Sequence, residues 1–82
     1  MRLDKYLKVS RIIKRRTVAN EACDAGRVMV NGKIARASYD VKIGDIIDLQ
    51  LGARGIKAKV VSVNEYAKKE DAPAMYEIIA ES

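Results

Sequence analysis

The side chains best suited to chemistry in this chain of 82 residues are arginines and lysines, and they gather in its first part. Residues 1–36 have a net charge of +7, whereas residues 37–82 have a net charge of −2. The ten basic side chains of the first part are Arg2, Lys5, Lys8, Arg11, Lys14, Arg15, Arg16, Arg27, Lys33 and Arg36. A strongly basic half on a small domain is the electrostatic pattern of a protein that binds a polyanion.

The composition excludes the commonest catalytic and metal sites. Histidine is absent and Cys23 is the only cysteine, so the sequence supplies neither a Cys/His zinc site nor a Ser-His-Asp or Cys-His pair. One thiol also allows no internal disulfide, and we expect Cys23 to be a small buried residue of a helix. We therefore expect a binding protein that is not an enzyme and that uses no cofactor.

Three consecutive cations, Lys14, Arg15 and Arg16, stand just before a predicted helix. The positive end of a helix dipole disfavours cations there, and an anion bound at the same helix end would offset this cost. At the start of the chain, Arg2 stands close to Asp4. Asp4 could cap the first helix, hold an arginine in position or accept a hydrogen bond from a ribose hydroxyl, and the sequence leaves these roles open.

Two short helices must position these residues. A helix is predicted over residues 2–9, and its apolar face is formed by Leu3, Tyr6 and Leu7. We expect Tyr6 to lie in the core on this face rather than to stack on a base. Thr17 is the predicted N-cap of the second helix. Gly26 suits the left-handed position that follows a helix end.

A small antiparallel sheet is predicted after the helices. Asn31-Gly32 between short apolar runs predicts a hairpin with a type I′ turn over residues 28–34. Further strands are expected over residues 46–51, 56–63 and 75–80. Val60 and Val61 break the alternation of the longest strand, which a bulge or burial on both faces would explain. Pro73 prevents a long helix in the polar segment before the last strand.

The length predicts one domain of the α+β class, with an N-terminal helix pair packed on a small antiparallel sheet. No run of about 18 apolar residues is present, so no membrane span is predicted. No apolar stretch of a signal peptide follows the basic start. We therefore expect the protein to stay in the cytoplasm.

Three short segments form a specific pattern, namely Lys14-Arg15-Arg16-Thr17, Gly26-Arg27-Val28-Met29-Val30-Asn31-Gly32 and Val41-Lys42-Ile43-Gly44-Asp45. Together with the helix pair, they resemble the RNA-binding domain named after small-subunit ribosomal protein S-four. The resemblance of this motif runs from residue 1 to about residue 51, and residues 52–82 would extend the sheet of the same single domain. It implies a protein that grips structured RNA along its helices and its hairpin.

Within that family, the segment from Met1 to Arg11 and the following basic run are most similar to RqcP and its relative, the fifteen-kilodalton heat-shock protein. The sequence shows no long lysine-rich C-terminal extension like that of the heat-shock protein, which favours the RqcP-like branch. The resemblance implies binding to a large ribosomal subunit that still holds an obstructed peptidyl-tRNA. It also implies support, with an RqcH-type tailing factor, for the addition of C-terminal alanines to the stalled chain.

By match of motif, Arg2, Asp4 and Arg16 would face ribosomal RNA and tRNA. The full set of candidate RNA-binding residues is Arg2, Asp4, Lys8, Arg11, Lys14, Arg15, Arg16 and Lys33. We expect the protein to be a monomer that does not bind membranes.

Four alternative functions stay open at this point. The chain could be a general rRNA-binding or ribosome-recycling protein like the fifteen-kilodalton heat-shock protein. It could be a helix-turn-helix DNA reader, although Asn20 would be the only good base-reading side chain in the middle of its second helix. It could be a piece of an RNA-modifying enzyme, or a module whose acidic second half contacts a protein.

Overall fold

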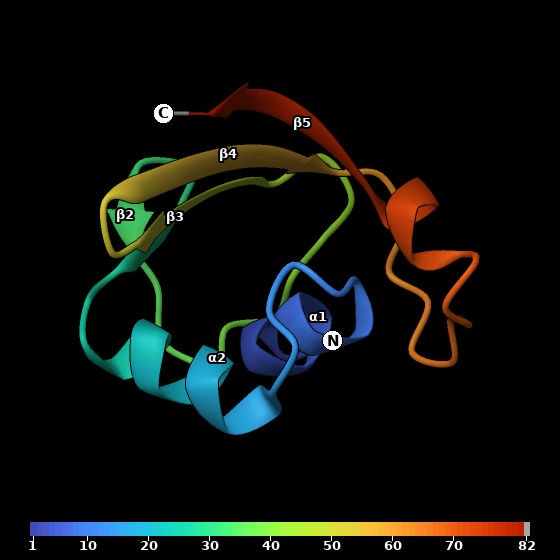
Figure 1. The fold of residues 1–82 in the computed structure, drawn as a ribbon, viewed down its shortest axis with the longest axis horizontal. Helices are drawn as coiled ribbons and strands as arrows, with labels where there is room; N and C mark the ends of the chain where they lie inside the picture. The colour runs from blue at the N-terminus through green and yellow to red at the C-terminus, as the bar shows by residue number, and fades with distance from the viewer. Residues whose placement is uncertain (82) are drawn as a thin grey trace.

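The computed structural model describes residues 1–81, in which two helices precede a sheet (Figure 1). The helices are α1 (Leu3–Val9), α2 (Arg16–Asp24) and a short 3-10 helix, η1 (Ala72–Met75). The strands are β1 (Val28–Val30), β2 (Lys33–Ile34), β3 (Ile46–Leu51), β4 (Arg54–Val60) and β5 (Tyr76–Glu81). The predicted order of two helices followed by a sheet is confirmed.

The strands of residues 1–81 form one antiparallel sheet in the order β2-β1-β3-β4-β5. In Figure 1, α1 and α2 lie together on one side of this sheet, and η1 lies beyond one end of it. A two-residue turn joins β3 to β4, since Leu51 pairs with Arg54 across it. The α+β class, with a helix pair packed on an antiparallel sheet, is therefore confirmed.

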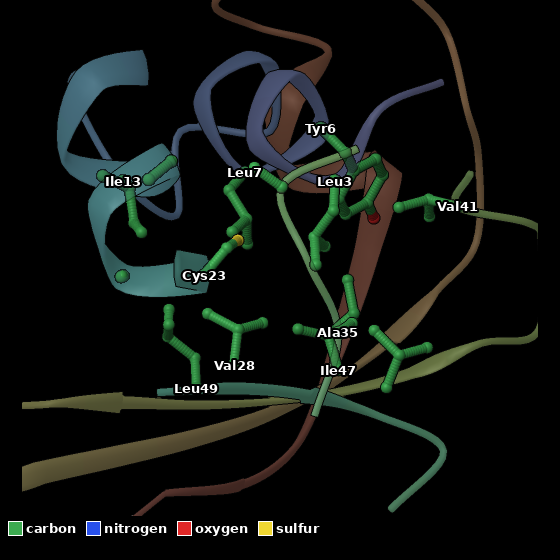
Figure 2. Packing of buried hydrophobic residues seen from close by; sticks show 14 of the residues in the cluster. Leu3, Tyr6, Leu7, Ile13, Cys23, Val28, Ala35, Val41, Ile47 and Leu49 are labelled. Atoms are coloured by element: carbon green, nitrogen blue, oxygen red, sulfur yellow. The ribbon is translucent and has the colours of Figure 1, made fainter. Parts of the chain in front are cut away.

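The core lies between α1 and the inner face of the sheet, and Figure 2 shows their side chains pointing toward one another. The largest contributors are Leu3, Tyr6 and Leu7 from α1 and Val28, Ile47 and Leu49 from the strands, all buried. Burial of one such side chain stabilises the fold by about 1.5–3 kcal/mol. A helix as short as α1 is unstable alone, so this packing is what holds it in place. The predicted core role of Tyr6 is confirmed.

The second helix begins earlier than predicted. Arg15 is its N-cap and Arg16 its first residue, so the prediction of Thr17 as the N-cap is wrong. The backbone explains the difference, because the amide of Ala19 already donates to the carbonyl of Arg15 at 3.1 Å and Thr17 therefore lies inside the first turn. Gly26 follows the end of the helix with a φ of +75°, as predicted.

The hairpin between β1 and β2 has the predicted turn. Asn31 and Gly32 have φ values of +53° and +83°, and a type I′ turn requires positive φ at both of its central positions. Val30 pairs with Lys33 directly across the turn. The hairpin is short because β2 contains only two residues.

The strand predicted over residues 56–63 differs from β4, which begins two residues earlier and ends three residues earlier. Val60 is buried, whereas Val61 is 46% exposed and lies beyond the strand. The explanation by burial on both faces is therefore wrong for this pair. The amides of Val61 and Ser62 both donate to the carbonyl of Met75, at 2.8 and 3.1 Å, so the ladder is irregular just after Val60. The register of the sheet also shifts between Lys57 and Ala58, opposite β5.

Pro73 lies in the first turn of η1, which agrees with the prediction that no long helix forms there. Met75 ends η1 and is buried, so the last strand begins one residue later than predicted, at Tyr76. Within residues 1–81, the helices are too short and too polar for any of them to cross a bilayer.

Candidate nucleic-acid interface

A buried carboxylate, Asp4, lies where α1 meets α2. Arg2 donates to it twice, at 3.1 Å from Nε to Oδ1 and at 3.3 Å from Nη2 to Oδ2. Asn20 donates from Nδ2 to Oδ2 at 3.2 Å, and the backbone amide of Lys5 donates to Oδ1 at 2.8 Å. The Nε atom of Arg16 lies 3.5 Å from Oδ2. We call Arg2, Asp4, Arg16 and Asn20 the Asp4 cluster.

Within this cluster the carboxylate is hidden and the arginines are accessible. The side chain of Asp4 is 3% exposed, whereas those of Arg2 and Arg16 are 50% and 49% exposed. Burial alone would raise the pKa of Asp4. Hydrogen bonds from Arg2, Asn20 and the Lys5 amide, with the charge of Arg16, outweigh burial and lower the pKa to about 2. Asp4 is therefore ionised at neutral pH and orients two cations toward solvent.

The structure distinguishes between the roles that the sequence left open for Asp4. Its one bond to the backbone goes to the amide of the next residue, Lys5, and no side chain within residues 1–81 caps α1. Its oxygens already accept from donors of this chain, and little of its surface is left for a ribose hydroxyl. Asp4 is thus a positioning residue for arginines.

Asn20 joins the cluster because of its place on α2. It lies one turn after Arg16, so both side chains lie on the same helix face. Sequence reasoning named Asn20 as a base reader and did not link it to the arginines, and its four-residue spacing from Arg16 was the signal that could have linked the two. A hollow of ≈370 Å³ lies beside the cluster and is lined by Asp4, Arg16, Thr17, Asn20 and Glu21.

Three other predicted residues come together at the opposite end of α1. Lys8, Arg11 and Lys14 line a hollow of ≈420 Å³ with Val9 and Ala67, which we call the basic hollow. All three cations are exposed. Arg11 follows the last turn of α1 with a φ of +63°, a left-handed backbone conformation that residues other than glycine rarely adopt.

The last two predicted residues stand apart from these groups. Arg15 is the exposed N-cap residue of α2. Lys33 is exposed in β2, and within residues 1–81 no hydrogen bond or ion pair joins it to the Asp4 cluster. It lines a hollow of ≈620 Å³ at the hairpin together with Arg36, a cation outside the predicted set.

Asp45 ties the hairpin to the start of β3. It accepts hydrogen bonds from Asn31 Nδ2 at 3.0 Å, from the Tyr39 hydroxyl at 2.9 Å and from the amide of Lys42 at 3.0 Å. Asn31 in turn accepts from the amide of Ile46 at 3.0 Å. The Asn-Gly turn and the Val-Lys-x-Gly-Asp segment, separate in the sequence, are thus one hydrogen-bonded unit.

The remaining reactive group, Cys23, is buried as predicted, and this burial raises the pKa of its thiol to about 11. The thiol therefore stays protonated and inert at neutral pH. Within residues 1–81, no group of three or more His, Cys, Asp or Glu side chains is arranged to hold a metal ion.

Comparison with known proteins agrees with this arrangement. Residues 1–47 match the S4 domain family. The RQC P-site tRNA stabilizing factor of Streptococcus pneumoniae is 55% identical over 82 residues, covering 100% of this chain and 93% of that protein. The factor of the same name from Bacillus subtilis is 49% identical, covering 99% of this chain and 94% of that protein.

The fold has a close counterpart among solved structures. Heat shock protein 15 of Vibrio cholerae, described as trimeric, superposes with a TM-score of 0.88 at 30% identity, covering 98% of this chain and 82% of that one. The match to the S4 domain spans more than half of the chain and includes both helices and the hairpin. The chain therefore belongs to the S4-domain family of RQC P-site tRNA stabilizing factors.

Proposed function

We propose that this protein binds the large ribosomal subunit together with its peptidyl-tRNA through the basic surface of α1 and α2. The Asp4 cluster is the observation that carries the proposal, because a buried carboxylate fixes two half-exposed arginines relative to each other. Each guanidinium can grip a phosphate with two parallel hydrogen bonds. A fixed pair of such groups fits a defined arrangement of phosphates, so the protein recognises the shape of folded RNA more than its base sequence.

The other cations extend this surface. The proposed RNA contacts are Arg2, Lys8, Arg11, Lys14, Arg15, Arg16 and Lys33, with Asp4 as the positioning residue. Within residues 1–81, no side chain caps the N-terminus of α2, and three cations crowd against it. A phosphate bound there would satisfy both the helix amides and these charges.

The biological role follows from this binding and from the relatives. They are named for stabilising P-site tRNA in RQC, the quality control of stalled ribosomes, and we assign the same role to this chain, in the cytoplasm. A protein that performs no chemistry shifts an equilibrium only by binding one state more tightly than another. By holding the tRNA where the next transfer begins, it would support alanine tailing of the stalled chain by an RqcH-type factor.

Charge removal at Arg16 tests the proposal. Arg16→Glu should abolish co-sedimentation with large subunits that carry peptidyl-tRNA, and Arg16→Gln should weaken it without setting a new carboxylate against Asp4. Arg54→Glu is the matched control, because Arg54 is an exposed cation at the start of β4 and lines neither the hollow beside the Asp4 cluster nor the basic hollow. Circular dichroism checks that each variant is folded. Equal binding of the Arg16 and Arg54 variants would contradict the proposal.

The cellular role needs its own measurement. Cells without this protein should still split stalled ribosomes but should add short alanine tails or none to a stalled reporter, and Arg16→Glu should reproduce this loss. Normal tail lengths in the deletion strain would refute the assignment to tailing. If duplex DNA competed as well as large subunits for the protein, the DNA-reading alternative would replace it.

A further inference from the structure

The positive charges of the basic hollow contribute no ion pair to the described part of the fold. Within residues 1–81, none of Lys8, Arg11 and Lys14 forms an ion pair with a carboxylate. Their like charges repel one another across a hollow of ≈420 Å³. This cost disappears when an anion occupies the hollow, so charge complementarity identifies the occupant as an anionic group.

The backbone at the rim of this hollow is held in a costly conformation. Arg11 has a φ of +63° directly after the end of α1, at a position where glycine would meet no steric penalty. The chain instead has an arginine there, and this residue lines the hollow. A purely structural helix end does not need this side chain.

A loop distant in the sequence closes the other side of the hollow. Ala67 lines it and packs against the core, and Figure 1 shows the loop before η1 in orange. Lys5 Nζ lies 3.5 Å from Glu65 Oε1, and this ion pair attaches the loop to α1. Within the loop, the amide of Tyr66 donates to Asn64 Oδ1 at 3.0 Å.

This loop presents an aromatic ring to solvent. Tyr66 is 86% exposed, and the residue that follows it, Ala67, lines the hollow. A tyrosine gains stability by burying its ring, and this one contributes almost nothing to the core. Two exposed lysines, Lys68 and Lys69, follow on the same loop, which also carries Glu65, Glu70 and Asp71. The combination of an exposed ring with the cations of the neighbouring hollow suits a nucleotide, which has a π-face and a phosphate.

We propose that the basic hollow and Tyr66 together hold one unstacked nucleotide of RNA. The cations of the hollow bind its phosphate, and the ring of Tyr66 stacks on its base. This inference rests on the proposed function, since it requires RNA as the ligand. It adds a contact to a single-stranded position, whereas the Asp4 cluster binds only phosphates.

An intrinsic fluorophore tests the stacking directly. The sequence contains no tryptophan, so Tyr66→Trp introduces a single indole at the proposed stacking position. A short oligoadenylate should quench its fluorescence, and a strand of equal length without bases should not. Tyr66→Ala should weaken oligoadenylate binding about tenfold or more, whereas Tyr66→Phe, which keeps the ring, should bind as wild type does. Unquenched fluorescence at saturating oligoadenylate would overturn the proposal.

The phosphate contact is tested at Arg11. Arg11→Asn removes the charge but keeps a side chain that tolerates left-handed backbone, so its melting temperature should not fall. The slope of log K against log salt for oligoadenylate should become shallower by about 0.7, the value for one lost contact on a single strand. Arg54→Asn should change neither quantity, and Lys14→Gln gives a second variant if Arg11→Asn is unstable. An unchanged slope in both hollow variants would refute the phosphate site.

Ribosomal particles identify the source of the nucleotide and separate this inference from the proposed function. Quenching of Tyr66→Trp on large subunits with and without peptidyl-tRNA would assign the nucleotide to rRNA. Quenching only on subunits that carry peptidyl-tRNA would assign it to tRNA. If the protein co-sediments, Arg16→Glu abolishes this and no quenching appears on either particle, the nucleotide site is wrong and the proposed function stands.

Discussion

At the scale of single residues, Asp4 is the side chain on which the candidate site depends. It accepts from Arg2 and Asn20 and lies 3.5 Å from Arg16, while almost none of its own surface reaches solvent. Hydrogen bonds to an ionised group are stronger than those between neutral groups. The same contacts therefore stabilise the packing of α1 on α2 and fix the orientation of two arginines.

Acid should expose this contribution to stability. The pKa of Asp4 is lowered from 3.8 to about 2 by the fold, so the folded chain binds fewer protons than the unfolded chain in this range. The stabilisation, at most about 2 kcal/mol, is complete above about pH 4 and is lost as the pH falls toward about 2. The pKa of Asp45 is also lowered and acts in the same direction.

The variant Asp4→Asn should lose less stability in acid than the wild type does, because it has no carboxylate at this position to protonate. Urea denaturation at neutral pH and at about pH 2.5 gives the unfolding free energy at each pH, and the difference between these two values should be smaller in the variant. Asp48→Asn is the control, since Asp48 lies on β3 away from the cluster. The same difference in Asp4→Asn and in wild type would contradict the ionised, buried role of Asp4.

Gly32 is the residue at which backbone conformation alone sets the cost of substitution. Its φ is +83°, and an added Cβ would meet no heavy atom within 4 Å. Gly32→Val should therefore destabilise the domain by about 1–2 kcal/mol through strain and without a clash. Gly32→Asn should cost clearly less, because asparagine tolerates this conformation. Thermal melting compares the two, and a valine variant as stable as wild type would argue against the type I′ turn.

Membership of the site could be predicted only in part. Arg2, Asp4 and Arg16 were grouped by resemblance to a family, and their charges marked the surface. Their contacts depend on how α1 packs on α2, which no local pattern contains. Asn20 shows this most clearly, because it bonds a carboxylate 16 residues earlier in the chain.

At the scale of elements, one hydrogen bond links the first helix to the end of the chain. Tyr6 donates from its hydroxyl to the carbonyl of Met75 at 2.8 Å in a buried setting. Tyr6→Phe should cost about 1 kcal/mol and lower the melting temperature by about 4–8 °C. Tyr66→Phe is the control, because that hydroxyl is exposed. Equal melting temperatures for the two variants would show that the link to η1 adds no stability.

The turn and the helix C-terminus that depend on single residues were predicted correctly from the sequence. Strand ends that depend on pairing with a distant segment were not. Gly26 and Asn31-Gly32 require positive φ, which is a property of the residues themselves. The end of β4 was misplaced because the amide of Val61 leaves the strand ladder and donates to the carbonyl of Met75 at 2.8 Å. That partner lies 14 residues later, and the alternation of apolar residues could not reveal it.

At the scale of the whole molecule, the basic and the acidic side chains lie on different secondary-structure elements. The helices and the hairpin carry the excess of basic side chains, whereas β3, β4, β5 and their loops carry a slight excess of acidic ones. Figure 1 shows the two helices together on one side of the sheet. Under the proposed function, the protein would approach its RNA with the helical side first.

Salt should weaken this approach in a measurable way. If about six phosphates are contacted, log K for folded ribosomal RNA should fall against log salt with a slope of roughly −4 to −5. Filter binding over a salt series gives the slope, and Arg54→Glu is a control for general charge effects. A slope near zero would mean that the basic side is not the binding surface.

Under the proposed function, Asp4 neutralises part of the charge that Arg2 and Arg16 would bring to RNA, and so it lowers the long-range attraction of the site. What it provides in return is order before contact, because a long side chain that becomes immobilised on binding costs about 0.5–1.5 kcal/mol of conformational entropy. With Arg2 already hydrogen-bonded and Arg16 within ion-pair distance in the free protein, much of that loss has occurred during folding. The proposed site would therefore trade strength on any RNA for discrimination between RNA shapes, since a flexible strand loses conformational entropy when it adopts the spacing of two pre-positioned guanidinium groups.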